Sequence, residues 1–193
     1  MISCIFVYGS SAVGKTAVTK KVVKVVGGKR RLALIQGDFF VHMIYGCTHT
    51  DKELDIKYLN IGFALDVFLS NGYSVVIDDI FKRQKDVNGL ISIMDRYNVS
   101  SCVFKLVAEQ DVLLSRNRSR DYWDWIPEEK IIRYPELLNG ITFGEEVIID
   151  TTDKTLEETV REVLERLKKS GFYNPGSPSI LEKTFHPVED KAE

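Results

Sequence analysis

Apolar residues in this chain fall into short continuous runs that alternate with segments of helical periodicity. Runs rich in Val, Ile, Leu and Phe and bounded by glycine or polar residues predict buried strands, because a strand covered on both faces has no polar side. Such strands are predicted at 2–7, 32–35, 73–77, 101–107 and 146–149. Helices are predicted at 17–26, from residue 38 onward, and at 57–70, 87–94, 109–120, 128–138 and 156–167.

Strands that alternate with helices predict right-handed βαβ units and a parallel sheet covered on both faces. We therefore expect a three-layer α/β domain with a five-stranded parallel sheet over residues 1–169. Glycine and proline interrupt the pattern beyond Ser170, so residues 170–193 are predicted to be an extended or disordered tail. Ligands of such sheets bind beyond the carboxyl ends of the strands, which makes polar residues after strands the candidates for chemistry.

The first predicted strand leads directly into the pattern G-x-x-x-x-G-K-T and then into a helix. The two glycines let the backbone turn and approach an anion, while the loop amides and the helix N-terminus supply positive partial charges. Lys15 places a cation near the outer phosphates, and the Thr16 hydroxyl is a hard ligand for Mg²⁺. A glycine-containing turn without a ligand is the alternative. The predicted phosphate-binding residues are Gly9, Ser10, Ser11, Ala12, Val13, Gly14, Lys15 and Thr16.

Asp38 ends the second predicted strand and is our candidate general base. In phosphoryl transfer to an alcohol, a carboxylate within hydrogen-bond reach can orient the hydroxyl and take its proton. The alternative is a helix N-cap, a position that Asp favours. His42 lies one helical turn later on the same face, where it either contacts substrate or packs and meets solvent.

Asp78 and Asp79 end the third predicted strand, beside the phosphate loop. An acid at this place suits a Mg²⁺ shell, and strand alternation makes the two side chains diverge, so one of them is expected to face the metal. Turn or helix-capping acids are the alternative. The basic run that follows contains Arg83, which either meets an anionic acceptor or belongs to a solvated surface.

Arg116 and Arg120 share a helix face after the fourth strand. Their guanidinium groups suit phosphate oxygens, and a lid over about 116–127 would exclude water from the transfer. A solvated helix end rich in basic residues is the alternative. Two tryptophans in this segment either stack on a base or cover apolar surface.

Composition narrows the class of protein. At 193 residues and a net charge near −2, the chain has no bulk basic field that would draw it onto nucleic acid or an anionic membrane. Its three cysteines are an odd number without metal-ligand spacing, which favours free thiols in a reducing compartment. No apolar run approaches the ~18 residues that span a bilayer, so we expect a cytoplasmic protein without a membrane partner.

Several segments together resemble a known group, the P-loop small-molecule kinases, whose members include gluconate kinase-like, chloramphenicol phosphotransferase-like and polynucleotide 5′-kinase-like proteins. These segments are GSSAVGKT, QGD, VVIDDIF, RNRSR and VIIDTTD, within residues 1–169. The resemblance implies a nucleoside-kinase-like P-loop fold with a lid. It also implies that Asp38 is the acceptor-binding base, that Arg116 and Arg120 are lid arginines, and that Thr151 and Thr152 lie near the adenine. The insert RDYWDWIPEEK does not match a sugar-kinase lid.

These features predict an ATP- and Mg²⁺-dependent kinase that acts on a hydroxyl of a sugar acid or nucleoside-like small molecule. The alternatives are a polynucleotide 5′-hydroxyl kinase, whose partner is a nucleic-acid end, and an ATP-binding regulatory NTPase without a phosphoryl acceptor. A GTPase is disfavoured because the sequence lacks the base-reading Asn/Thr-Lys-x-Asp motif.

Overall fold

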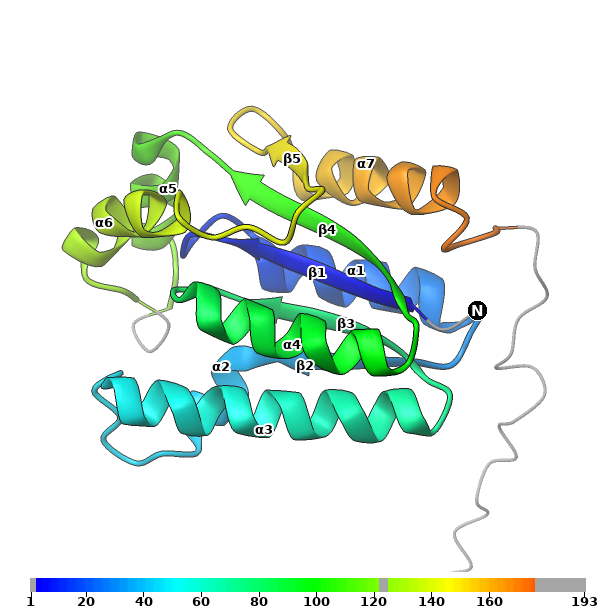
Figure 1. Ribbon diagram of the computed structural model, residues 1–193. Helices are drawn as coiled ribbons and strands as arrows, with labels where there is room; N and C mark the ends of the chain where they lie inside the picture. Colours follow the sequence, from blue (N-terminus) through cyan, green and yellow to red (C-terminus); the bar gives the residue numbers. More distant parts are fainter. Residues whose placement is uncertain (1–2, 122–124, 176–193) are drawn as a thin grey trace, which may run out of the picture.

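A parallel sheet with the strand order β2-β3-β1-β4-β5 runs through the centre of the computed structural model, which describes residues 3–121 and 125–175 (Figure 1). Each neighbouring pair of strands is parallel. The predicted five-stranded parallel sheet is therefore confirmed within these residues. The strands are β1 (Ser3–Gly9), β2 (Leu32–Gln36), β3 (Ser74–Asp79), β4 (Ser100–Val107) and β5 (Val147–Asp150).

Helices cover both faces of the sheet, with α3 and α4 on one side and α1 and α7 on the other (Figure 1). This arrangement is the three-layer α/β architecture that the alternating pattern predicts. The helices that the structure describes are α1 (Lys15–Gly27), α2 (Gly37–His42), α3 (Asp51–Ser70), α4 (Gln84–Arg96), α5 (Gln110–Arg118), α6 (Glu128–Leu138) and α7 (Leu156–Lys169).

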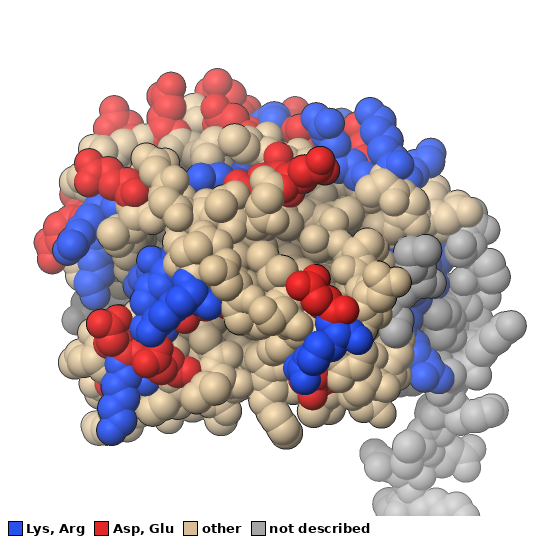
Figure 2. Space-filling view, in the orientation of Figure 1, with Lys and Arg blue, Asp and Glu red and all other residues tan. Residues whose placement is uncertain are grey.

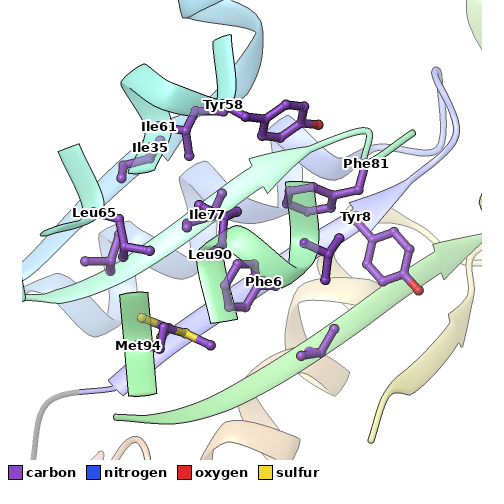
Figure 3. Packing of buried hydrophobic residues seen from close by; sticks show 14 of the residues in the cluster. Phe6, Tyr8, Ile35, Tyr58, Ile61, Leu65, Ile77, Phe81, Leu90 and Met94 are labelled. Atoms are coloured by element: carbon purple, nitrogen blue, oxygen red, sulfur yellow. The ribbon is translucent and has the colours of Figure 1, made fainter. Parts of the chain in front are cut away.

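Strand β1 supplies side chains to both halves of the core because successive residues point to opposite faces. Phe6 and Tyr8 join the cluster beneath α3 and α4, and Figure 3 shows both rings beside Phe81. The intervening residues of β1 face α1 and α7. Because every residue of this central strand is buried, the loop that follows it starts from a firmly held position.

The order of the strands fixes where that loop lies. The chain passes from β1 through α1 to β2 at one edge, returns to β3 beside β1, and then crosses to β4 on the other side of β1. The connections after β1 and β3 therefore leave in opposite directions, and the carboxyl end of β1 is a topological switch point. Open α/β sheets bind their ligands at such a point.

Helix α3 begins at Asp51, six residues before the predicted start. Its N-terminus is a capping box in which the Thr50 side chain accepts from the Glu53 amide, and the Glu53 carboxylate accepts from the Thr50 amide. The pattern Thr50-x-x-Glu53 was the sequence signal for this start. Thr155 caps α7 in the same way, through a capping box with Glu158.

Acidic and basic side chains lie next to each other on the face formed by α3 and α4, as Figure 2 shows. Two ion pairs join these helices, Lys85 to Asp55 at 2.9 Å and Arg96 to Asp66 at 2.9 Å. This face has charges of both signs and no broad basic field, in keeping with the small net charge.

Phe172 is buried against the cluster beneath α1 and α7, so the packed chain continues slightly past the predicted domain end at residue 169. Most of the predicted tail, 176–193, lies outside the described residues, as do residues 122–124 of the predicted lid. Among the helices of the described segments, each is too short or too polar to cross a lipid bilayer.

Candidate functional site

The loop between β1 and α1 has the backbone conformations of an anion-binding nest. Gly9, Ala12 and Gly14 have φ values of 152°, 65° and 99°. Gly9 is required for a further reason, because a Cβ there would lie 2.3 Å from the Leu106 carbonyl oxygen of the neighbouring strand β4. The first glycine therefore serves the packing of β1 against β4 as well as the turn. At Gly14 the space is open, so its backbone conformation alone demands glycine.

Lys15 is the first residue of α1, and its side chain folds back over the loop. It is 8% exposed, and its Nζ donates to the Ser10 carbonyl oxygen at 2.9 Å. Burial lowers the Lys15 pKa, while the nearby carboxylates of Asp78 and Asp38 act in the opposite direction and favour the charged amine. The amine is thus held at the loop in a position from which it can exchange a carbonyl oxygen for a phosphate oxygen.

Thr16 and Asp78 form a pair of hard oxygen ligands beside the loop. The Thr16 hydroxyl donates to Asp78 Oδ2 at 2.8 Å, and the Thr19 hydroxyl approaches the same oxygen at 3.3 Å. Burial raises the Asp78 pKa, whereas Lys15 and the Thr16 hydrogen bond oppose that rise. A hydroxyl and a carboxylate at one point fit Mg²⁺, which proteins hold through one or two such groups together with substrate phosphates.

Asp79 points away from this pair, so the two adjacent carboxylates diverge as strand alternation requires. Its Oδ1 accepts from Lys57 Nζ at 2.6 Å in an ion pair whose side chains are 0% and 5% exposed. Its Cγ lies 2.4 Å from the place where a Cβ on Gly37 would stand. This geometry favours Asp78 over Asp79 as the metal-facing acid and makes Asp79 part of the support beneath α2.

A cleft of about 820 Å³ opens between the phosphate loop and α2. Lys15 and Thr16 line one side, and Asp38 and His42 line the other. Asp38 is exposed, makes no side-chain cap to α2, and has no hydrogen bond or ion pair within residues 3–121 and 125–175. The structure therefore brings the predicted base into the same cleft as the phosphate loop, with its carboxylate available. Further lining residues are Lys20, Gln36, Phe39, Ile80, Arg120, Trp125 and Ile126.

The two predicted lid arginines occupy different places. Arg120 lines the cleft, and its charge opposes the protonation of Lys15. Arg116 instead donates to the Thr151 hydroxyl at 2.9 Å and to the Thr151 carbonyl oxygen at 2.6 Å, which fixes the turn after β5. Thr152 is occupied in this turn, where it accepts from the Glu109 amide. The lid role of Arg116 and the base contacts of both threonines stay predictions, and their hydrogen bonds give them a structural role.

Arg83 was predicted to contact substrate, but the structure does not bring it to the cleft. Its guanidinium is paired with the carboxylates of Asp51, Asp55 and Asp86 at 2.7–3.2 Å. The pairs hold the start of α4 against α3, and they argue against a substrate contact.

Lys57 was not singled out from the sequence. A signal was present, because this lysine falls at helical spacing from Leu54 and Ile61 on the buried side of α3. A charged residue in an apolar stripe points to a buried partner. Which partner it meets was not visible, since Asp79 lies 22 residues further along the chain.

Comparison with solved structures places this arrangement of strands and helices among known folds. A sugar kinase from Janibacter sp. HTCC2649 superposes with a TM-score of 0.70 over 92% of this chain and 99% of that one, at 17% identity. A gluconokinase from Sinorhizobium meliloti 1021 gives 0.66 over 88% and 95%, at 21% identity. The chain has the fold of the P-loop kinases.

A third solved structure with this fold is the Mycobacterium tuberculosis APS kinase CysC in complex with AMPPNP and APS. It has a TM-score of 0.64 and 12% identity, over 86% of this chain and 98% of that chain. No protein-family model matches the sequence, and no curated protein matches it either. At these identities the likeness shows the fold alone.

Proposed function

We propose that this protein is an ATP-dependent kinase that transfers the γ-phosphoryl group to a hydroxyl of a small-molecule acceptor. The observation that carries the proposal is the shared cleft, in which the Asp38 carboxylate, without a partner in the described parts of the chain, lies opposite Lys15 and Thr16. A nucleotide-binding protein without an acceptor has no need of a free carboxylate across an open space from its phosphate loop. The names of the structural neighbours, among them a sugar kinase and an APS kinase, agree with this class of reaction.

In the proposed reaction the loop amides and Lys15 bind the phosphates of ATP. Asp38 accepts the proton of the acceptor hydroxyl while that oxygen bonds to the γ-phosphorus. The bond from this phosphorus to the β–γ bridging oxygen breaks, and its electron pair leaves on ADP. Arg120, which lines the cleft, would neutralise charge on the transferring group.

Thr16 and Asp78 would hold Mg²⁺ in this site. When bound, the metal supplies a Lewis acid that neutralises charge on the phosphate oxygens. Among the described residues no three His, Cys, Asp or Glu side chains gather into a metal site of their own. A donor set of one hydroxyl and one carboxylate instead matches an ion that arrives with the nucleotide.

The deciding experiment is an acceptor screen with γ-labelled ATP across sugars, sugar acids, nucleosides and 5′-hydroxyl oligonucleotides. Phosphorylation of one acceptor, reduced about 10²–10⁴-fold by Asp38→Asn with ATP affinity retained, is the expected result. Equal turnover by the wild type and the variant would remove Asp38 from the mechanism. ATP hydrolysis without any phosphorylated acceptor would favour the regulatory NTPase.

A further inference from the structure

Lys82 lies close in sequence to the cleft wall that contains Ile80, and it has no carboxylate partner among the residues that the structure describes. It follows the cleft-lining Ile80 by two residues, and its side chain is half-buried. Its Nζ lies 4.9 Å from the centre of the Tyr134 ring and 3.5 Å from the Tyr134 hydroxyl. Within the described parts of the chain no Asp or Glu oxygen comes within 4.0 Å of this amine.

Lys130 adds a second positive charge at the same place. It precedes Tyr134 by one turn of α6, so both side chains lie on one face of the helix. Lys130 is exposed, and it too lacks an ion pair among the residues that the structure describes. Nearby, Lys57 is already neutralised by Asp79.

The pKa values of two nearby groups reflect this excess of positive charge. Burial lowers the Lys82 pKa, and Lys57 and Lys130 lower it further, while Asp79 and Asp38 oppose them. The His49 pKa is likewise lowered by burial first and then by the same lysines, with Asp38 opposing. An anion bound between Lys82 and Lys130 would relieve this repulsion.

Asp38 connects this basic pair to the phosphate loop. Its carboxylate acts electrostatically on Lys15 on one side and on Lys82 on the other. Lys82 follows the cleft-lining Ile80 by two residues, so an acceptor that extends from Asp38 along this wall would bring its remote end toward the basic pair.

We infer that the acceptor is a small molecule with an oxyanion remote from its reacting hydroxyl, and that Lys82 and Lys130 bind this oxyanion beside the Tyr134 hydroxyl. The oxyanion is a carboxylate or a phosphate or sulfate ester, all of which present oxygens to ammonium donors. The inference rests on the proposed kinase function, and it excludes a neutral nucleoside or neutral sugar as the preferred acceptor.

The test compares matched charged and neutral compounds, with Mg²⁺ and AMPPNP present so that binding is measured without turnover. The probes for isothermal titration are gluconate against sorbitol and glucose 6-phosphate against glucose. We expect one charged compound to bind at least about tenfold more tightly than its neutral partner, since a charge-assisted hydrogen bond contributes on the order of tenfold or more. Lys82→Gln and Lys130→Gln should each remove most of that difference and leave AMPPNP binding unchanged.

Lys85→Gln is the matched control, because Lys85 lies three residues from Lys82 but is exposed and paired with Asp55. This variant should not change the difference in affinity between the charged and the neutral compound. Lys130→Gln alters an exposed side chain, so it keeps the test valid even where Lys82→Gln perturbs the packing on Tyr134.

Equal affinity for charged and neutral partners would overturn the inference, as would a Lys85→Gln effect as large as that of Lys82→Gln. Failure of both charged probes to bind through Lys82 would overturn it as well. Tight, strongly salt-dependent binding of a 5′-hydroxyl oligonucleotide through these lysines would replace the small molecule with nucleic acid. Lys82-dependent binding of an anion without phosphorylation of any acceptor would instead refute the kinase function and leave the anion site standing.

Discussion

The buried ion pair between Lys57 and Asp79 offers a sharp test of how the acceptor side of the cleft is supported. Lys57→Met keeps the length and apolar stem of the side chain but removes its charge. The variant leaves the Asp79 carboxylate, 0% exposed, without its cationic partner. Asp79 Oδ2 already lacks a hydrogen-bond partner within the described residues, and the variant would also remove the ion pair to Oδ1.

Removal of one member of a buried pair lowers the free energy of unfolding by about 3–5 kcal/mol, because an uncompensated charge stays in the interior. This amount is a large fraction of the roughly 5–15 kcal/mol that keeps a typical domain folded. Lys57→Met combined with Asp79→Asn leaves no buried charge and nearly the same shape. We therefore expect the double variant to lose less than the sum of the single losses, with a coupling energy of about 1–3 kcal/mol.

The assay is urea unfolding at constant pH, followed by circular dichroism, for both single variants and the double variant. The matched control is Lys85→Met, which breaks an exposed pair with Asp55 whose side chains are 61% and 51% exposed. It should cost less than about 1 kcal/mol. A Lys57→Met loss no larger than this control, or strict additivity of the two single variants, would refute a buried ion pair at this position.

Three further predictions concern the phosphate loop and the core. Lys15→Ala should weaken both ATP binding and turnover, because the Nζ held at the loop is the cation nearest the phosphates; an unchanged ATP titration would contradict the loop assignment. Gly9→Ala should lower the melting temperature, because the added Cβ would lie 2.3 Å from the Leu106 carbonyl oxygen, which is held in β4. A melting temperature equal to that of the wild type would show that β1 and β4 separate easily there. Burial raises the pKa of the Cys4 thiol to about 12. At pH 8 Cys4 should therefore react with a thiol reagent only as fast as the protein unfolds, far more slowly than Cys102. Fast labelling of three thiols in the folded protein would refute this.

The fold and the phosphate loop could be predicted from the sequence because both depend on local patterns. Apolar runs and helical periodicity report whether a segment is buried on two faces or one, and their alternation already implies a parallel sheet. The loop needs two glycines, a lysine and a threonine within eight neighbouring positions, so no distant residue enters its definition. The position of Asp38 just after a strand, in the first turn of α2, likewise placed it on the binding edge of the sheet.

Only the tertiary structure decided what each remaining charged side chain does, because those roles depend on partners far away in the sequence. Asp78 and Asp79 are adjacent, yet the pairing of β3 with β1 turns the first toward Thr16, and helix α3 brings Lys57 to the second. Arg83 is held by carboxylates on α3 and α4, and Arg116 by the turn after β5. Lys82 stays without a carboxylate among the described residues, and no local pattern distinguishes it from Arg83, because the field at a side chain is set by what folds around it.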